Sequence, residues 1–145
     1  MSDNKIQEFP VNSIRLCFDS LDGEACQGRI LGIALKEEIL FRGMTELIVQ
    51  IDEAFNKIGQ PQPYKVLRSF GKSEGFQSYK GSPVRYYTSG EIAAAKGKEK
   101  TFDLIMTSRH RAEWQGMIKD SDGRMMGNFE TILECMQLLG YPVFD

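Results

Sequence analysis

Apolar residues recur at helical spacing in two separate stretches of the chain. After Phe41 they fall at offsets of 3, 6, 7, 10 and 14 residues, and after Phe129 at offsets of 3, 6, 7 and 10. This spacing is typical of the buried stripe of an amphipathic helix. A glycine, Gly59 or Gly140, follows each stripe, and a proline comes two residues later in both cases, as is common at a helix C-terminus. The pattern therefore predicts a helix after Phe41 and a second helix after Phe129.

Shorter stretches of alternating apolar residues precede each predicted helix. Residues 14–18 alternate in this way, an Asp-Gly pair at positions 22–23 suits a tight turn, and the chain returns over residues 29–33. A second hairpin is indicated downstream, around a longer basic connection. With a short third strand before each helix, the predicted strands cover residues 14–18, 29–33, 37–41, 102–107, 113–119 and 124–129.

The two stretches align with each other at an offset of 88 residues. No gap is needed between residues 14–51 and 102–139, and seven of the 38 aligned positions are identical. The identical pairs are Leu16/Leu104, Ser20/Ser108, Gln27/Gln115, Gly28/Gly116, Ile30/Ile118, Phe41/Phe129 and Glu46/Glu134.

These observations predict an α+β fold in which a ββ(β)α unit is repeated in tandem around a pseudo-two-fold axis. The two units would span residues 14–59 and 102–140, and they would share one antiparallel sheet with the helices packed on one face, because a lone unit would leave its sheet bare. The whole chain, residues 1–145, has the length of a single domain.

The segment between the units, residues 60–101, differs from both of them. Residues 65–111 contain ten basic and four acidic residues, whereas the rest of the chain contains eight and sixteen, so the net charge of −2 conceals a dipolar chain. Six aromatic residues alternate with these bases: Phe70, Phe76, Tyr79, Tyr86, Tyr87 and Phe102. Cations next to aromatic rings are typical of sites for single-stranded nucleic acid or nucleotides. They are equally typical of a solvated basic face whose aromatics belong to the core.

Local signals within this segment predict two strands and a short helix. The strands are expected over residues 64–70 and 84–88, on either side of a Gly/Ser-rich loop over 71–82. Thr88 and Glu91 have the spacing of a capping box, which predicts a helix over residues 92–96.

Six residues are candidate contacts to an anionic partner: Arg85, Lys98, Arg109, His110, Arg111 and Trp114. We favour an anion contact over catalysis for His110, because the sequence places no nucleophile and orienting acid beside it. Trp114 begins the tripeptide Trp-Gln-Gly, whose counterpart in the first unit is Cys-Gln-Gly. A glycine repeated inside a strand is typical of a bulge or a close backbone approach, so Trp114 is either a core residue or an exposed stacking platform.

No motif indicates a metal or cofactor. Residues 66–73 end like a phosphate-binding loop, but a valine replaces the first glycine and no helix is expected to follow. Residues 120–123 suggest a calcium loop, but Arg124 stands where that motif needs Asp or Asn, so they are predicted to form a turn. The cysteines, Cys17, Cys26 and Cys135, lack Cys-x-x-Cys and zinc spacing, so we expect reduced thiols in apolar surroundings.

Residues 106–139 contain R-x-R-A-E-W-Q-G followed by F-E-T-I-L-E-C-M-Q-L. This stretch, about a quarter of the chain, resembles uncharacterised small proteins common in gut clostridia, whose pattern is roughly R-Q-N-x-x-W-Q-G … F-R-S-x-L-E-L. The chain departs from it at positions 110–111, His-Arg in place of Gln-Asn, and at 130–131, Glu-Thr in place of Arg-Ser. The resemblance implies a bacterial, cytoplasmic protein and no particular activity.

Composition and hydropathy indicate the class of protein and its location. The apolar and charged fractions, 41% and 26%, are those of an ordinary globular domain. The longest apolar stretch, residues 30–35, is too short to cross a bilayer, and residues 1–10 lack a signal-peptide pattern, so we expect a cytoplasmic protein without a membrane partner. We predict a non-enzymatic binding or regulatory module that binds nucleic acid or a nucleotide through residues 65–111. The alternative is a protein-interaction adaptor or oligomerisation module, such as a homodimer, without a nucleic-acid role.

Overall fold

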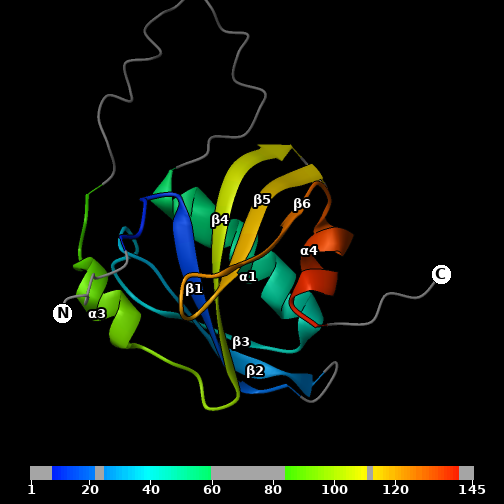
Figure 1. Ribbon diagram of the computed structural model, residues 1–145, viewed down its shortest axis with the longest axis horizontal. Helices are drawn as coiled ribbons and strands as arrows, with labels where there is room; N and C mark the ends of the chain where they lie inside the picture. Colours follow the sequence, from blue (N-terminus) through cyan, green and yellow to red (C-terminus); the bar gives the residue numbers. More distant parts are fainter. Residues whose placement is uncertain (1–7, 22–24, 60–83, 111–112, 141–145) are drawn as a thin grey trace, which may run out of the picture.

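A computed structural model describes residues 8–21, 25–59, 84–110 and 113–140 (Figure 1). Within these residues the chain forms one antiparallel sheet with the strand order β3-β2-β1-β4-β5-β6, and three helices. The elements are β1 (Ser13–Ser20), β2 (Gln27–Leu31), β3 (Ile39–Arg42), α1 (Met44–Ile58), α3 (Ser89–Ala94), β4 (Lys100–His110), β5 (Glu113–Asp120), β6 (Met125–Phe129) and α4 (Ile132–Leu138). The predicted α+β class and antiparallel sheet are confirmed.

β1 and β4 pair at the middle of the sheet. Arg15 lies directly opposite Asp103, which is 88 positions later in the chain. The other pairs are arranged symmetrically about this one: Ile14–Leu104 and Leu16–Phe102, then Ser13–Ile105 and Cys17–Thr101. The central pair therefore joins positions that correspond at the 88-residue offset, and the flanking pairs exchange their counterparts symmetrically about it.

The hairpins on the two sides of this junction have the same register. In β1 and β2 a bulge separates the Phe18–Gly28 pair from the next, and in β4 and β5 a bulge follows the Met106–Gly116 pair. The third strands then pair with the same glycines, Gly28 with Phe41 and Gly116 with Phe129. A Cβ atom at either glycine would collide with a backbone carbonyl and lie 2.9 Å from the tip of that phenylalanine ring, so both positions require glycine.

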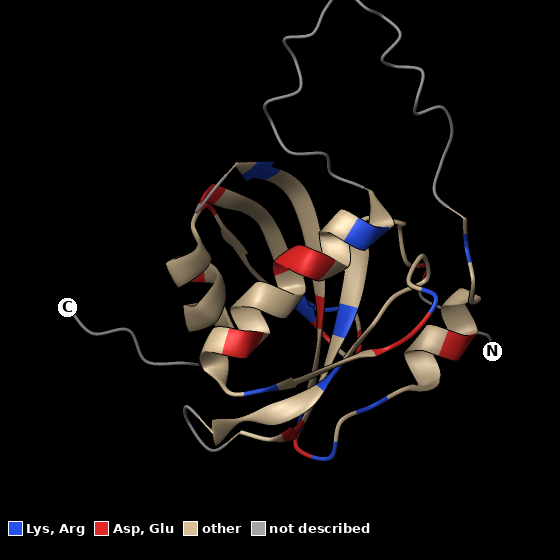
Figure 2. Cartoon of the chain, turned by 180° about the vertical axis from the view of Figure 1, so that it is seen from behind, with Lys and Arg blue, Asp and Glu red and all other residues tan. Residues whose placement is uncertain are grey.

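Helices α1 and α4 cover one face of the sheet, with α1 in front of it in Figure 2. Both helices are followed by a glycine at positive φ, 85° at Gly59 and 101° at Gly140, as the C-terminal signals predicted. Side chains from both helices join the sheet in one apolar core. Its largest fully buried members include Trp114, Phe18, Phe55, Phe129, Leu16, Ile30, Leu47 and Ile51.

The opposite face of the sheet, which we call the second face, carries α3. This short helix begins with the predicted capping box, in which Thr88 Oγ1 accepts from the Glu91 amide and Glu91 Oε1 from the Thr88 amide. The expectation of helices on one face holds for α1 and α4 but not for α3. The reason is the buried charge of Arg15, whose Nη1 donates to the carbonyl oxygens of Ala93 and Ala95 at the end of α3, at 2.9 and 3.0 Å.

Arg15 also forms a two-pronged ion pair with Asp103. Arg15 Nε and Nη2 donate to the two carboxylate oxygens at 2.8 and 2.9 Å, and both side chains are almost completely buried. Burial raises the pKa of the Asp103 carboxyl, and the hydrogen bonds from Arg15 oppose that shift. A smaller apolar cluster of Phe9, Ile33 and Ile92 lies on this side of the sheet, with the Phe9 ring against the Arg15 guanidinium.

Two local predictions have different outcomes. Residues 120–123 form the predicted turn, in which Gly123 has a φ of 87° and Asp120 Oδ1 accepts from the amides of Asp122 and Arg124. Residues 84–88 do not form the predicted strand. They contact the connection between β2 and β3 through the Tyr86 amide, which donates to the Ile33 carbonyl at 2.7 Å, and through the Tyr87 hydroxyl, which donates to the Lys36 carbonyl at 2.7 Å. These two bonds do not form a ladder. The expected strand at 64–70, the loop at 71–82 and the turn at 22–23 lie outside the described residues.

Candidate interaction surface

Arg109, one of the predicted anion contacts, is an internal anchor. Its side chain is 5% exposed, and Nη1 donates to Asp52 Oδ1 at 2.9 Å and to Asn56 Oδ1 at 3.0 Å, both on α1. The bulge after Met106 shifts the alternation of β4 and so turns Arg109 toward the helix. The structure therefore does not support the anion contact predicted for Arg109, because its guanidinium is buried and already bound to α1.

Trp114 pairs with Arg109 across β4 and β5, and it is 1% exposed. Its ring belongs to the main core, so the stacking-platform hypothesis is wrong and the core alternative is confirmed. The counterpart Cys26 is also buried. Alternation along β5 could have identified this burial, since Trp114, Gly116 and Ile118 all point toward the helices.

The remaining predicted contacts come from separate segments. Arg85 is exposed ahead of α3, Lys98 is exposed between α3 and β4, and His110 is exposed at the end of β4. Arg111 lies outside the described residues. The structure therefore does not assemble the predicted set into one site.

Residues 95–100, which we call the basic connection, cover part of the second face over β1 and β2. The Glu99 amide donates to the Phe18 carbonyl at 2.9 Å, and Arg29 Nη2 donates to the Lys96 carbonyl at 3.1 Å. A Cβ atom at Gly97 would collide with the Phe18 backbone, so the connection lies directly against β1. Its three lysines, Lys96, Lys98 and Lys100, are all exposed. All three lie in the basic stretch 65–111, and Lys98 is the one among them predicted to contact a partner.

The corresponding part of the second face over β4, β5 and β6 is accessible. Alternation puts five central side chains there, which we call the open face: Ile105, Gln115, Met117, Met125 and Asn128. Glu113 and Lys119 alternate onto the same side near the two ends of β5. Ile105, Met117 and Asn128 form a row across the three strands. Gln115, Met125 and Asn128 are exposed, and Ile105 and Met117 are half-buried. None of the five carries a charge, whereas the neighbouring Glu113 and Lys119 do. Sequence reasoning missed the five because each is an ordinary strand residue.

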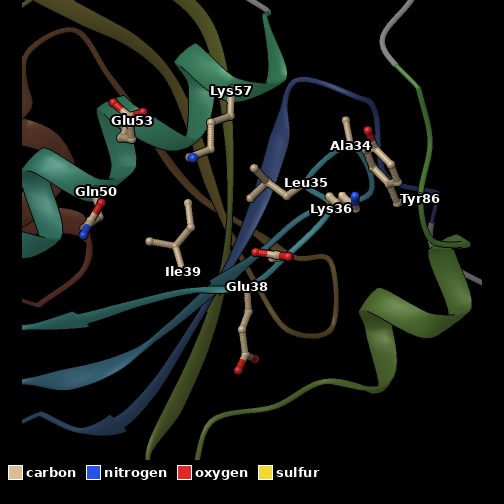
Figure 3. A pocket seen from close by; sticks show the side chains of 10 residues that line it. Ala34, Leu35, Lys36, Glu38, Ile39, Gln50, Glu53, Lys57 and Tyr86 are labelled. Carbon is tan, nitrogen blue, oxygen red and sulfur yellow. The ribbon is translucent and has the colours of Figure 1, made fainter.

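A hollow of about 590 Å³ lies between α1 and residues 34–39 (Figure 3). Leu35 and Ile39 line its apolar part, while Glu53 and Lys57 approach from α1 in Figure 3. Charges of both signs surround it, so it has no preference for an anion. Its described lining residues include three glutamates and two lysines but no histidine, cysteine, serine or threonine.

The described residues contain no cluster of three or more His, Cys, Asp and Glu side chains able to hold a metal ion. The three cysteines, all free and buried, match the packing role expected of them. Burial raises the pKa of the Cys17 thiol to about 11 and that of Cys135 to about 12. Both thiols are protonated at neutral pH, which makes them poor nucleophiles.

Comparisons with protein-family models, curated proteins and solved structures found no match to this chain. The resemblance to the clostridial proteins therefore stays a prediction. Among the described helices, none combines the length and apolar character needed to span a membrane.

Proposed function

We propose that this protein is a non-enzymatic interaction module that binds a protein partner on the open face. The observation that carries the proposal is an accessible sheet surface with five uncharged side chains at its centre and the charged Glu113 and Lys119 at its margin, in a chain of which one quarter is charged. The centres of protein interfaces are depleted of charged residues and enriched in methionine. Met117 and Met125 can adapt their shape to an apolar partner, while the amides of Gln115 and Asn128 can pair with its polar groups.

The positions of Arg109 and Trp114 favour a protein partner over nucleic acid. Single-stranded nucleic acid requires rings for base stacking and cations for phosphates. Trp114 is buried in the core, Arg109 is bound to α1, and the five open-face side chains include no aromatic ring, with Lys119 as a neighbouring cation.

A second candidate function is binding of an anionic partner on the basic connection. Three exposed lysines within five residues favour it, together with Arg29, which donates to the same segment. Asp19 and Glu99 offset part of this positive charge, since Asp19 Oδ1 accepts from the Lys98 amide at 3.0 Å. Binding at this surface would weaken steeply as salt is added, whereas binding at an uncharged face would not.

We also propose that the fold is a tandem pseudo-two-fold repeat of one βββα unit, located in the cytoplasm. Support comes from the symmetric β1–β4 ladder and from the like surroundings of Gly28 and Gly116. Further support comes from two glutamates 88 residues apart: Glu46 accepts from the Arg42 amide, and Glu134 from the Glu130 amide. The three free, buried thiols suit a reducing compartment.

Quantitative capture of host proteins tests the proposed function. The wild-type chain is compared with Gln115→Lys/Asn128→Lys on the open face and with Lys96→Glu/Lys98→Glu on the basic connection. We expect a protein retained by the wild type at high salt and after nuclease treatment to be lost with the first variant and kept with the second. Loss with the second variant alone, in a salt-sensitive manner, would favour the anionic partner instead.

A further inference from the structure

The sheet ends in two edge strands, β3 and β6, and β3 is the regular one. Its four residues pair with β2 without interruption, from Gln27–Arg42 to Ile30–Ile39. The ladder of β6 is broken by a bulge near Met125. Bulges protect an edge from further pairing, whereas a regular edge can accept another strand.

The outward hydrogen-bonding groups of β3 can be assigned from its contacts. The Gly43 amide donates inward to the Cys26 carbonyl at 2.6 Å, whereas the Arg42 amide is bound by the Glu46 side chain. Because inward and outward groups alternate along an antiparallel strand, Leu40 directs its N–H and C=O groups away from β2. Glu38 immediately precedes β3 and is next in the same alternation. The Leu40 side chain is 65% exposed. The edge therefore offers both backbone groups and an apolar side chain to a partner.

We propose that β3 pairs with β3 of a second copy of this chain, antiparallel and centred on Leu40. Each Leu40 then exchanges two backbone hydrogen bonds with Leu40 of the second copy, and the two exposed side chains cover each other. Glu38 faces Arg42 of the second copy, and Arg42 faces its Glu38. In this dimer the Glu46 carboxylate still accepts the hydrogen bond from the Arg42 amide of its own chain. The Glu38 amide donates to the Arg42 carbonyl of the second copy.

Charge complementarity selects this register. A two-fold contact needs a surface that complements itself, and β3 has an acid before it and a base at its end. Sliding the pairing by two residues is the smallest shift that keeps outward groups facing each other. That shift puts Leu40 opposite Glu38 or Arg42 and breaks both charge pairs, which disfavours it. Within its own chain Glu38 has a loose ion pair with Arg29 at 3.8 Å, and its side chain is 49% exposed.

Pairing through β3 leaves the open face accessible, because β3 and β6 are opposite ends of the sheet. The second copy would extend the sheet at β3 and place one open face at each far end. The inference is independent of the partner proposed for the open face, since oligomeric state and partner capture are separate measurements.

Sedimentation velocity of the full chain over a concentration series tests the pairing. We expect the wild type to form a dimer and Leu40→Lys, which places like charges opposite each other, to weaken it at least about tenfold. Asn128→Lys is the matched control, since position 128 corresponds to 40 on the other edge, and it should leave the dimer intact. Thermal melts show whether each variant is folded.

A charge exchange tests the register itself. Arg42→Glu should weaken the dimer several-fold, and Glu38→Arg/Arg42→Glu should restore it, since opposite charges face each other again. A wild type that stays monomeric at the highest concentration reached, a dimer that survives Leu40→Lys, or a double variant as weak as Arg42→Glu would each overturn the proposal.

Discussion

The two halves of the sheet share a strand register but differ in what lies on their second faces. Over β1 and β2 the face is covered by the basic connection, by α3 and by the cluster of Phe9, Ile33 and Ile92. Over β4 to β6 the five side chains of the open face are exposed or half-buried and uncharged, with Glu113 and Lys119 beside them. The two halves therefore differ in accessibility although their strand register is the same. Residues 84–100 and Phe9 cover one half and leave the other accessible.

The helix faces differ less. α1 has 15 residues and α4 has seven, yet both are followed by a glycine at positive φ and both bury apolar side chains in one core. The additional residues of α1 include Asp52 and Asn56, which accept hydrogen bonds from Arg109 of β4. The first half has Leu21 at the corresponding position, so this contact is specific to the second half.

The largest expected effect is at the junction of the halves. Asp103→Ala leaves Arg15 buried without its carboxylate partner, and we expect a loss of about 3–5 kcal/mol in the free energy of unfolding, measured by denaturant titration. The double variant Arg15→Met/Asp103→Leu removes both charges and should recover most of that loss. If the free energy of unfolding of the double variant is no higher than that of Asp103→Ala, the unpaired charge of Arg15 is not the cause of the loss.

Removing the two aromatic rings above the glycines tests whether the halves are built alike. Phe41→Ala and Phe129→Ala should each cost about 3–5 kcal/mol, since both rings are buried against Gly28 or Gly116. Chemical melts of both variants provide the comparison. A negligible cost at either position would contradict the equivalence of the two hairpins.

A smaller loss is expected at Arg109. Arg109→Ala removes hydrogen bonds to Asp52 and Asn56, and we expect a loss of about 1–2 kcal/mol, because Asp52 is half-exposed and screened by solvent. Arg85→Ala is the control and should change stability by less than about 0.5 kcal/mol, since that side chain is exposed. Equal effects of the two variants in the same melts would show that Arg109 is not an anchor.

Periodicity in the sequence predicted the six strands, α1, α4 and the capping box of α3, because these features depend on local spacing. The burial of Trp114 could have been predicted in the same way, because Trp114 alternates with strand residues that face the core. The burial of Arg109 could not be predicted from local spacing. A bulge in β4 turns its side chain toward α1, where it binds Asp52, 57 residues earlier in the chain. The side of the sheet that α3 occupies was also beyond local spacing, since it depends on where Arg15 finds its acceptors.

The smallest effect on stability is expected on the open face. Met117→Ala should cost under about 1.5 kcal/mol because the side chain is only half-buried, and Gln115→Ala should be close to neutral. Both variants should nevertheless weaken partner capture more than they weaken the fold. If the amount of captured partner decreases only in proportion to the melting temperature of each variant, these residues affect capture only through stability.

Site-specific photo-crosslinking in host cells tests the central claim most directly. A photoreactive residue is placed at Gln115 on the open face or at Gln27, its exposed counterpart on the covered half. We predict a discrete crosslinked protein other than this chain at position 115 and none of that protein at position 27. Equal crosslinking at both positions, or crosslinks at neither while a partner is still captured, would contradict the claim that the open face is the interaction surface.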